Sequence, residues 1–123
     1  MNKEELQSKK ITDYLEENYP DYMDKILLAD GFEDAFVGVV ECMGFQPKAC
    51  YDAEKCIDIL TGRPDHLGVQ NEAMTYDEAV EYFHFNVTQA YVGEHTPAFI
   101  NLQGQPPIPT FEEMKAYQKI NRV

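Results

Sequence analysis

The stretch AFVGVVECM, residues 35–43, decides the fold. Aromatic and β-branched residues dominate it and favour a strand, whereas a helix would hold Gly38 in its interior at a cost of about 1 kcal/mol. The helical alternative stays open, because the apolar residues of this stretch also recur at helical spacing. We predict a strand here, a turn over residues 44–47 and a returning strand over residues 48–51. These two strands would begin a sheet.

Helical segments are predicted on both sides of this hairpin. The expected helices cover residues 3–18, 21–29, 53–61, 75–91 and 110–121. Thr75 with Glu78, and Thr110 with Glu113, have the spacing of capping boxes. A further short strand is expected over residues 96–101. The sequence therefore predicts an α+β fold, in which a small antiparallel sheet of about three short strands packs with helices, plus N- and C-terminal helices.

A chain of 123 residues has the commonest size of a single domain. Charge and composition divide it into three segments. These are an acidic N-terminal helical segment over residues 1–29, a core α+β domain over residues 30–102, and a Pro-rich connector with a C-terminal helix over residues 103–123. We find no linker long enough to separate independent domains.

The chain is strongly acidic, since 22 Asp and Glu residues against 10 Lys and Arg residues give a net charge of −12. Phosphate backbones should repel such a chain, so we expect no direct binding of nucleic acid. We find no apolar run long enough to cross a membrane, and residues 1–5 are too polar for a secretory signal. We therefore expect a cytoplasmic protein without a membrane partner.

Three cysteines, Cys42, Cys50 and Cys56, are interpreted as small apolar residues of the core. Their odd number argues against a disulfide framework, and their spacing matches no common zinc motif. In the predicted hairpin, Cys42 and Cys50 would lie nearly opposite each other. No cofactor is expected from this pattern.

The sequence contains no nucleophile elbow, no phosphate-binding loop and no H-E-x-x-H metal site. This favours a non-enzymatic protein. One enzymatic alternative stays open. Glu81 and His84 lie three residues apart on the predicted 75–91 helix, and His95 follows it, so the three could hold a metal or serve acid–base chemistry.

The predicted 75–91 helix is apolar on two sides, which is typical of a central helix or an interface. The residues proposed to contact a partner are Asp77, Glu78, Glu81, Tyr82 and Phe85. Base stacking is disfavoured, because stacking surfaces normally accompany a basic groove. The two-sided helix also leaves open a self-associating structural or virion module, and with it a homo-oligomer.

Five runs of sequence carry a resemblance. They are DGFEDAFVGV (30–39), YDAEKCI (51–57), MTYDEA (74–79), EYFHFNV (81–87) and AYVGEHTPAF (90–99). Together they resemble small acidic proteins of tailed bacteriophages and some bacteria, a group without an assigned activity. The resemblance implies a phage accessory protein in the host cytoplasm, and it supplies no catalytic residue.

Such proteins often bind a host protein, for example a defence nuclease or a polymerase. The resemblance and the acidity therefore lead to one leading hypothesis: a non-enzymatic module that binds and modulates a host protein. The favoured partner is a basic nucleic-acid-processing enzyme. The negatively charged module could occupy the groove of that enzyme by mimicking nucleic acid.

Overall fold

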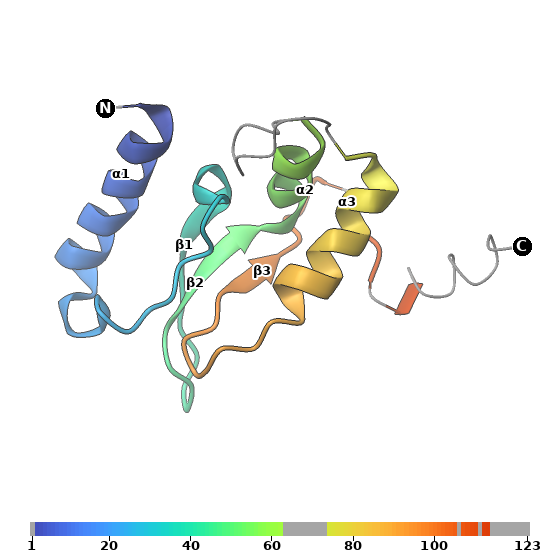
Figure 1. Ribbon diagram of the computed structural model, residues 1–123. Helices are drawn as coiled ribbons and strands as arrows, with labels where there is room; N and C mark the ends of the chain where they lie inside the picture. The colour runs from blue at the N-terminus through green and yellow to red at the C-terminus, as the bar shows by residue number, and fades with distance from the viewer. Residues whose placement is uncertain (1, 63–73, 106, 111, 114–123) are drawn as a thin grey trace, which may run out of the picture.

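The computed structural model describes residues 2–62, 74–105, 107–110 and 112–113. The elements in chain order are α1 (Lys3–Asn18), η1 (Pro20–Tyr22), η2 (Glu33–Ala35), β1 (Phe36–Val40), β2 (Lys48–Asp52), α2 (Ala53–Gly62), α3 (Tyr76–Phe83), η4 (His84–Thr88) and β3 (Ala98–Ile100). Here η1 and η2 are single 3₁₀ turns, and η4 is a π-helical turn. The predicted α+β fold with about three short strands is confirmed (Figure 1).

The sheet has the order β1-β2-β3, so β2 is its central strand. β1 and β2 are antiparallel, which confirms the predicted hairpin and the strand in residues 35–43. β2 and β3 are parallel, so the sheet is mixed, and the expectation of a purely antiparallel sheet is wrong for this pair. The reason is the connection: the chain crosses over through α2 and α3 before β3 begins, and a crossover returns the strand in the same direction.

The register of the hairpin separates two of the cysteines. Cys50 pairs with Gly38, and Cys42 is exposed in the loop beyond the end of β1. The expectation that these two cysteines face each other is therefore wrong, because β1 ends at Val40 and the connection is longer than the predicted turn. The register shifts between Phe36 and Gly38, where Gly38 has a φ of +145° that L side chains rarely adopt.

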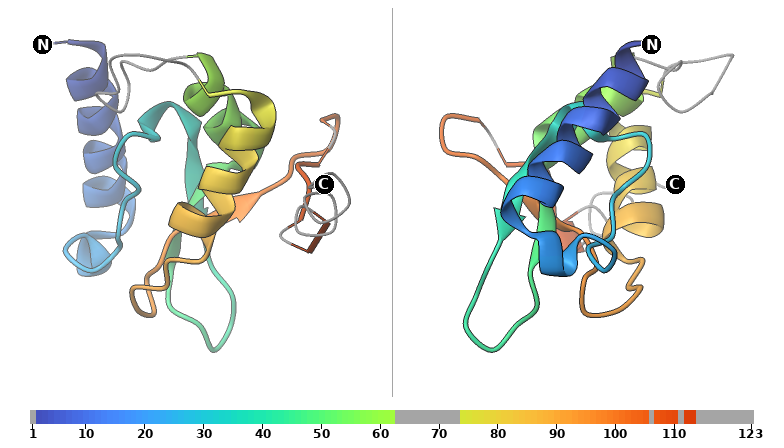
Figure 2. Two further views of the ribbon diagram at one scale, coloured as in Figure 1. Left: turned by 45° about the vertical axis from the view of Figure 1, so that its right-hand side comes forward. Right: turned by 90° about the vertical axis from the view of Figure 1, so that its left-hand side faces the viewer.

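α2 and α3 lie on one face of the sheet, and α1 flanks the edge formed by β1 (Figure 2). An aromatic cluster fills the space between the sheet and α3. The ring of Tyr51 on β2 lies 5.7 Å from that of Phe36 on β1 and 5.8 Å from that of Phe99 on β3. Phe83 of α3 meets Phe99 edge to face, with 5.0 Å between the ring centroids. Each strand thus gives one aromatic side chain to the core.

The three segments expected from the sequence share one hydrophobic core. Ile11 and Leu15 of α1, Ile26 of the following segment and Ile108 of the Pro-rich connector all belong to the same buried cluster. The N-terminal 29 residues therefore pack on the sheet domain. Their burial removes apolar surface from water, which is the main force holding α1 in place.

The helix expected over residues 21–29 is wrong, because only the short turn η1 forms there. Two backbone N–H groups of this segment have tertiary partners. Leu27 donates its N–H to the carbonyl oxygen of His95 at 3.4 Å, and Ala29 donates its N–H to the hydroxyl oxygen of Tyr51 at 2.8 Å. These bonds replace the hydrogen bonds that a helix would have formed.

Two of the other predicted helices form as expected, and a third is shorter than expected. Those over residues 3–18 and 53–61 are confirmed as α1 and α2, and both capping boxes form. The helix expected over residues 75–91 is α-helical only to Phe83 and ends with η4 at Thr88. Beyond residue 113 the expected C-terminal helix lies outside the described residues.

Candidate interaction site on helix α3

The start of α3 is fixed by a capping box. Glu78 donates its backbone N–H to the Thr75 hydroxyl oxygen at 3.2 Å, and Thr75 donates its backbone N–H to the Glu78 carboxylate at 2.9 Å. Two backbone donors of the first turn are thereby satisfied. The carboxylates of Asp77 and Glu78 also lie at the positive end of the helix dipole, which stabilises them there.

One face of α3 anchors the helix to the core. Ala79, Val80 and Phe83 are buried, and their spacing of three and four residues places them on the side facing α2 and the sheet. Because this face is fully used by the core, the other face is held in a constant position relative to the sheet.

The opposite face of α3, together with Met74 before it and the start of η4, lines a cavity of about 450 Å³. Its lining residues are Met74, Glu78, Glu81, Tyr82, Phe85 and Asn86. Glu78, Glu81, Tyr82 and Phe85 follow the spacing i, i+3, i+4 and i+7, which puts them in one stripe along the helix. We call this cavity the α3 groove. It mixes carboxylates with partly exposed rings, since Tyr82 is 37% and Phe85 is 51% exposed.

Four of the five predicted interaction residues therefore line the α3 groove. The fifth, Asp77, is exposed on the first turn of α3 and is not among the lining residues. Sequence reasoning missed Met74 and Asn86. Met74 directly precedes the capping residue, and Asn86 lies four residues after Tyr82 and donates its amide N–H to that residue's carbonyl oxygen at 3.3 Å. Helical spacing alone could have found Asn86.

Carboxylates from two helices crowd together beside the first turn of α3. Burial and then the neighbouring Asp58 and Asp52 raise the pKa of Glu54 on α2. Burial and then Glu54, Asp77 and Asp58 raise the pKa of Tyr76 on α3. Glu54 and Tyr76 favour their neutral forms chiefly because they are partly buried, and secondarily because carboxylates lie nearby. Acidic side chains therefore gather between α2 and α3.

The His84 side chain makes hydrogen bonds to two other residues. Its Nε2 lies 2.6 Å from the carbonyl oxygen of Pro109, and its Nδ1 lies 3.3 Å from the hydroxyl of Thr88. A carbonyl oxygen only accepts hydrogen bonds, so the ring carries its proton on Nε2 and donates it to Pro109. The buried imidazole thereby joins η4 to the Pro-rich connector.

The alternative metal or acid–base set of Glu81, His84 and His95 is not assembled. Glu81 lines the α3 groove, His84 is bound to the connector, and His95 donates its Nδ1–H to the carbonyl oxygen of Pro47 at 2.8 Å. Among the described residues, no group of three or more His, Cys, Asp and Glu side chains is placed to hold a metal ion. The hypothesis therefore gains no geometric support.

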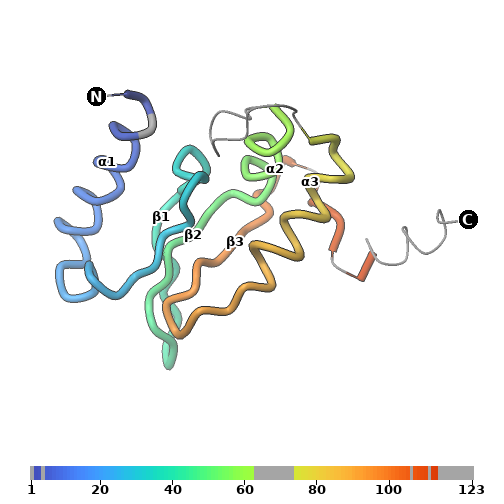
Figure 3. Tube along the Cα trace, viewed as in Figure 1, coloured from blue at the N-terminus to red at the C-terminus, as the bar shows by residue number. Residues whose placement is uncertain are grey.

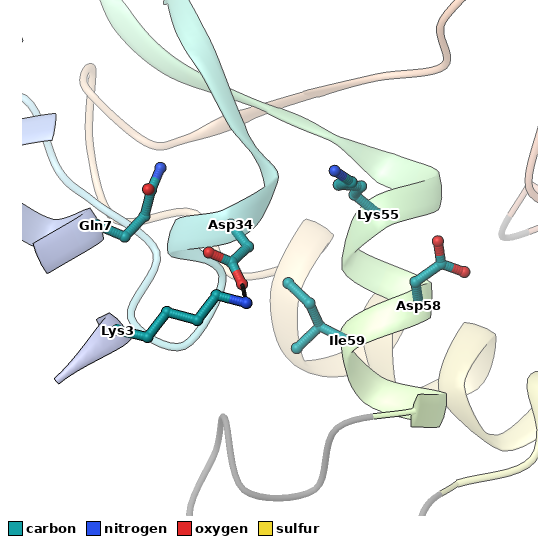
Figure 4. A pocket seen from close by; sticks show the side chains of 6 residues that line it. All are labelled: Lys3, Gln7, Asp34, Lys55, Asp58 and Ile59. Carbon is teal, nitrogen blue, oxygen red and sulfur yellow. Dashed lines mark ion pairs between the residues drawn. The ribbon is translucent and has the colours of Figure 1, made fainter. Parts of the chain in front are cut away.

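A second cavity, of about 310 Å³, lies between α1, η2 and α2 (Figure 4). Its lining residues are Lys3, Gln7, Asp34, Lys55, Asp58 and Ile59. The Lys3 ammonium and the Asp34 carboxylate form an ion pair at 4.0 Å, with the Lys3 side chain 72% exposed, so water screens the pair. Charges of both signs meet in this cavity, which gives it no clear preference for a charged ligand. Sequence reasoning missed it because its residues come from three distant segments.

Comparison of the chain with protein-family models, with curated proteins and with solved structures finds no match. Within the part of the chain that the structure describes, no helix combines the length and the apolar character needed to cross a bilayer.

Proposed function

We propose that this protein is a non-enzymatic, acidic interaction module whose α3 groove binds a basic segment of another protein. The observation that carries the proposal is the groove itself. Two carboxylates and then two aromatic rings follow one another along one face of the helix, and the opposite face is buried in the core. Another protein could therefore bind at the groove without displacing the buried residues of α3.

The chemistry of the groove selects the partner. Glu78 and Glu81 offer carboxylates to Arg or Lys side chains, and charge-assisted hydrogen bonds of this kind are stronger than neutral ones. Tyr82 and Phe85 offer ring faces for a guanidinium group or for an apolar side chain. A segment that combines basic and apolar residues satisfies both kinds of group.

The crowding of Glu54, Asp58 and Asp77 around Tyr76 supports the same partner. A basic surface placed against this cluster would be attracted by several carboxylates at once. Opposite charges on the two proteins would also steer their approach and speed association.

The biological setting that we propose follows from the sequence resemblance described above. The protein is a phage accessory protein of the host cytoplasm that binds and modulates a host protein, with a basic nucleic-acid-processing enzyme as the favoured target. In the nucleic-acid mimicry form of the proposal, the acidic positions within residues 4–34 and 72–81 stand in for phosphates. Exposed Glu16 and Glu17 on α1 would extend that surface beyond the groove.

Affinity capture with two matched variants tests the role of the groove. The groove variant combines Glu81→Lys with Phe85→Ser. The control variant makes the same chemical changes outside the groove and outside the acidic positions of the mimicry form, with Glu112→Lys and Leu6→Ser at exposed positions. Each tagged protein is mixed with nuclease-treated lysate of a bacterial host, and the retained proteins are identified and quantified by mass spectrometry.

We expect one abundant basic protein to be retained stoichiometrically by the unchanged protein and by the control variant. The groove variant should retain at least tenfold less of it. Equal retention by both variants would refute the groove as the binding site. Raising the salt to about 0.5 M shortens the Debye length to about 4 Å, so retention that does not change would remove the mimicry form of the proposal.

A further inference from the structure

Among the described residues, the four most exposed large apolar side chains are Met43, Tyr91, Phe45 and Val92, which lie in two loops at one end of the molecule. The less exposed Leu27 and Leu28 lie in a third loop beside them. We call this surface the loop end. It consists of Leu27, Leu28, Met43, Phe45, Tyr91 and Val92. Met43 is 98% and Phe45 is 70% exposed, and Tyr91 and Val92 are 75% and 60% exposed. Exposed apolar patches of this kind mark interaction sites in soluble proteins.

The topology of the sheet brings these loops together. β2 and β3 are parallel, so the loops that precede them, residues 41–47 and 89–97, leave the same end of the sheet (Figure 3). Sequence reasoning missed this surface, because an antiparallel β3 would have placed the second loop at the opposite end.

His95 holds the three loops in a fixed arrangement. Its Nδ1–H donates to the carbonyl oxygen of Pro47 at 2.8 Å, and its own carbonyl oxygen accepts the N–H of Leu27 at 3.4 Å. Its ring lies 6.0 Å from that of Tyr22. The ammonium of Lys48 also donates to the backbone carbonyl of Glu94. A surface ordered before binding loses little entropy when it binds.

The loop end is nearly neutral in a chain of net charge −12. Residues 22–28, 36–48 and 88–97 contain three acidic and two basic residues, a net charge of −1. The remaining −11 lies elsewhere in the chain. Two copies of this protein repel each other through most of their surfaces, and contact through the loop end minimises that repulsion.

The loop end also carries both a projection and a hollow. Met43 and Phe45 project from the hairpin loop, and a cavity of about 370 Å³ opens beside them. Its lining residues are Tyr22, Glu41, Cys42, Met43, Phe45 and Pro47. A contact between two identical patches requires that the patch fit itself, so a projection beside a hollow is the shape that a two-fold interface needs.

We propose that the loop end binds a second copy of this chain and forms a two-fold symmetric dimer, with the side chains at the tip of each hairpin loop placed in the cavity of the other copy. This dimer leaves both α3 grooves open, because the groove residues are not part of the loop end. The inference therefore stands independently of the function proposed for the groove.

Solution mass over a hundredfold concentration range tests the proposal. The loop variant Met43→Ser with Phe45→Ser changes the two projecting side chains, and the control Leu6→Ser with Phe85→Ser removes exposed apolar side chains elsewhere. We expect the mass of the unchanged protein to rise from 14.2 kDa towards twice that value. The loop variant should raise the dissociation constant at least tenfold, and the control should not change it.

A mass of 14.2 kDa at every concentration would overturn the proposal, and so would a dimer that the loop variant leaves intact. The capture experiment gives the opposite pattern for the groove, since Phe85→Ser should affect capture and Met43→Ser should not. Failure of one proposal is therefore distinguishable from failure of the other.

Cys42 offers a second test, which uses chemical cross-linking. It is exposed and lines the loop-end cavity, whereas Cys50 and Cys56 are buried. A short bismaleimide reagent should link Cys42 of one copy to Cys42 of the other. We expect the linked dimer to disappear in Cys42→Ser and to form at least tenfold more slowly in the loop variant. Equal rates in the loop variant and the unchanged protein would show random collision and contradict the dimer.

Discussion

Ala29 donates its backbone N–H to the hydroxyl oxygen of Tyr51 at 2.8 Å, and this single bond joins the N-terminal segment to the central strand of the sheet. Tyr51 is 1% exposed, and it is surrounded by the aromatic cluster of the core. The bond satisfies a phenol oxygen that burial would otherwise leave without water. The burial of this phenol, rather than the bond, makes the core sensitive to alkaline pH.

Burial raises the pKa of Tyr51 to about 12 from an ordinary value near 10. The unfolded chain therefore ionises this phenol first, and the folded state loses stability as pH rises from about 10 to about 12, by at most about 2–3 kcal/mol. Below pH 10 both states are neutral and the effect vanishes. Denaturant unfolding measured at a series of pH values should show this decline, and Tyr51→Phe should show a shallower one. Parallel curves for the two proteins would contradict the assignment.

The three cysteines should differ sharply in reactivity. Burial raises the pKa of the Cys50 and Cys56 thiols and also denies reagents access to them, while Cys42 is exposed. A maleimide should therefore modify one thiol per native chain quickly and all three thiols after unfolding. Peptide mapping should place the fast modification on Cys42. Rapid modification of Cys56 in the native protein would mean that α2 does not pack as described.

His84 should stabilise the protein by joining η4 to the connector. His84→Ala removes the hydrogen bond to Pro109 and leaves that carbonyl oxygen without this partner, so we expect a loss of about 1–3 kcal/mol in the free energy of unfolding. Thr88→Val removes the contact to Nδ1 and the hydrogen bond that the Thr88 hydroxyl donates to the His84 carbonyl oxygen, both at 3.3 Å, and should cost less because the bond to Pro109 remains. Hydrogen exchange at the Ile108 amide should quicken in the first variant only. Equal exchange in both variants would argue against this role for His84.

Glu78 has two roles that substitutions can separate. Glu78→Gln keeps a side chain that suits a capping box but removes a charge from the α3 groove. We expect the free energy of unfolding to change by less than about 0.5 kcal/mol, while binding of the captured basic partner weakens about five- to tenfold.

Thr75→Ala is the matched counterpart. It removes the capping hydroxyl and should lower the free energy of unfolding by about 1 kcal/mol, yet it leaves the charges of the groove unchanged. Calorimetric titration with the partner and denaturant unfolding give the two readouts. If Glu78→Gln lowers stability as much as Thr75→Ala does, then Glu78 serves the helix rather than the groove.

Local features were predictable from the sequence. α1, α2, the hairpin and both capping boxes depend on residues that are close in sequence, and all four were predicted correctly. The stripe of Glu78, Glu81, Tyr82 and Phe85 was found for the same reason, since helical spacing places these residues on one face. Where short-range periodicity determines a structural element, a single sequence is sufficient to predict that element.

Several errors involve contacts between distant segments, whereas the expected pairing of Cys42 with Cys50 failed locally because the hairpin loop is longer than predicted. The segment over residues 21–29 has helical spacing, but Tyr51 and His95 supply its backbone with tertiary hydrogen bonds instead. The direction of β3 depends on how the α2–α3 crossover packs on the sheet, which no local pattern encodes. The loop end could not be predicted, because it forms only when that crossover brings two loops to one end of the sheet.

The irregular register between Phe36 and Gly38 also limits how copies of this chain can assemble. β1 is an outer strand, its sequence FVGVV is uncharged, and such strands tend to recruit further strands into open-ended aggregates. The bulge breaks the even spacing of backbone groups that an added strand would need, and α1 flanks the same edge. The dimer proposed above would accordingly use side-chain contacts rather than a continuous sheet, so it could dissociate and would close at two subunits.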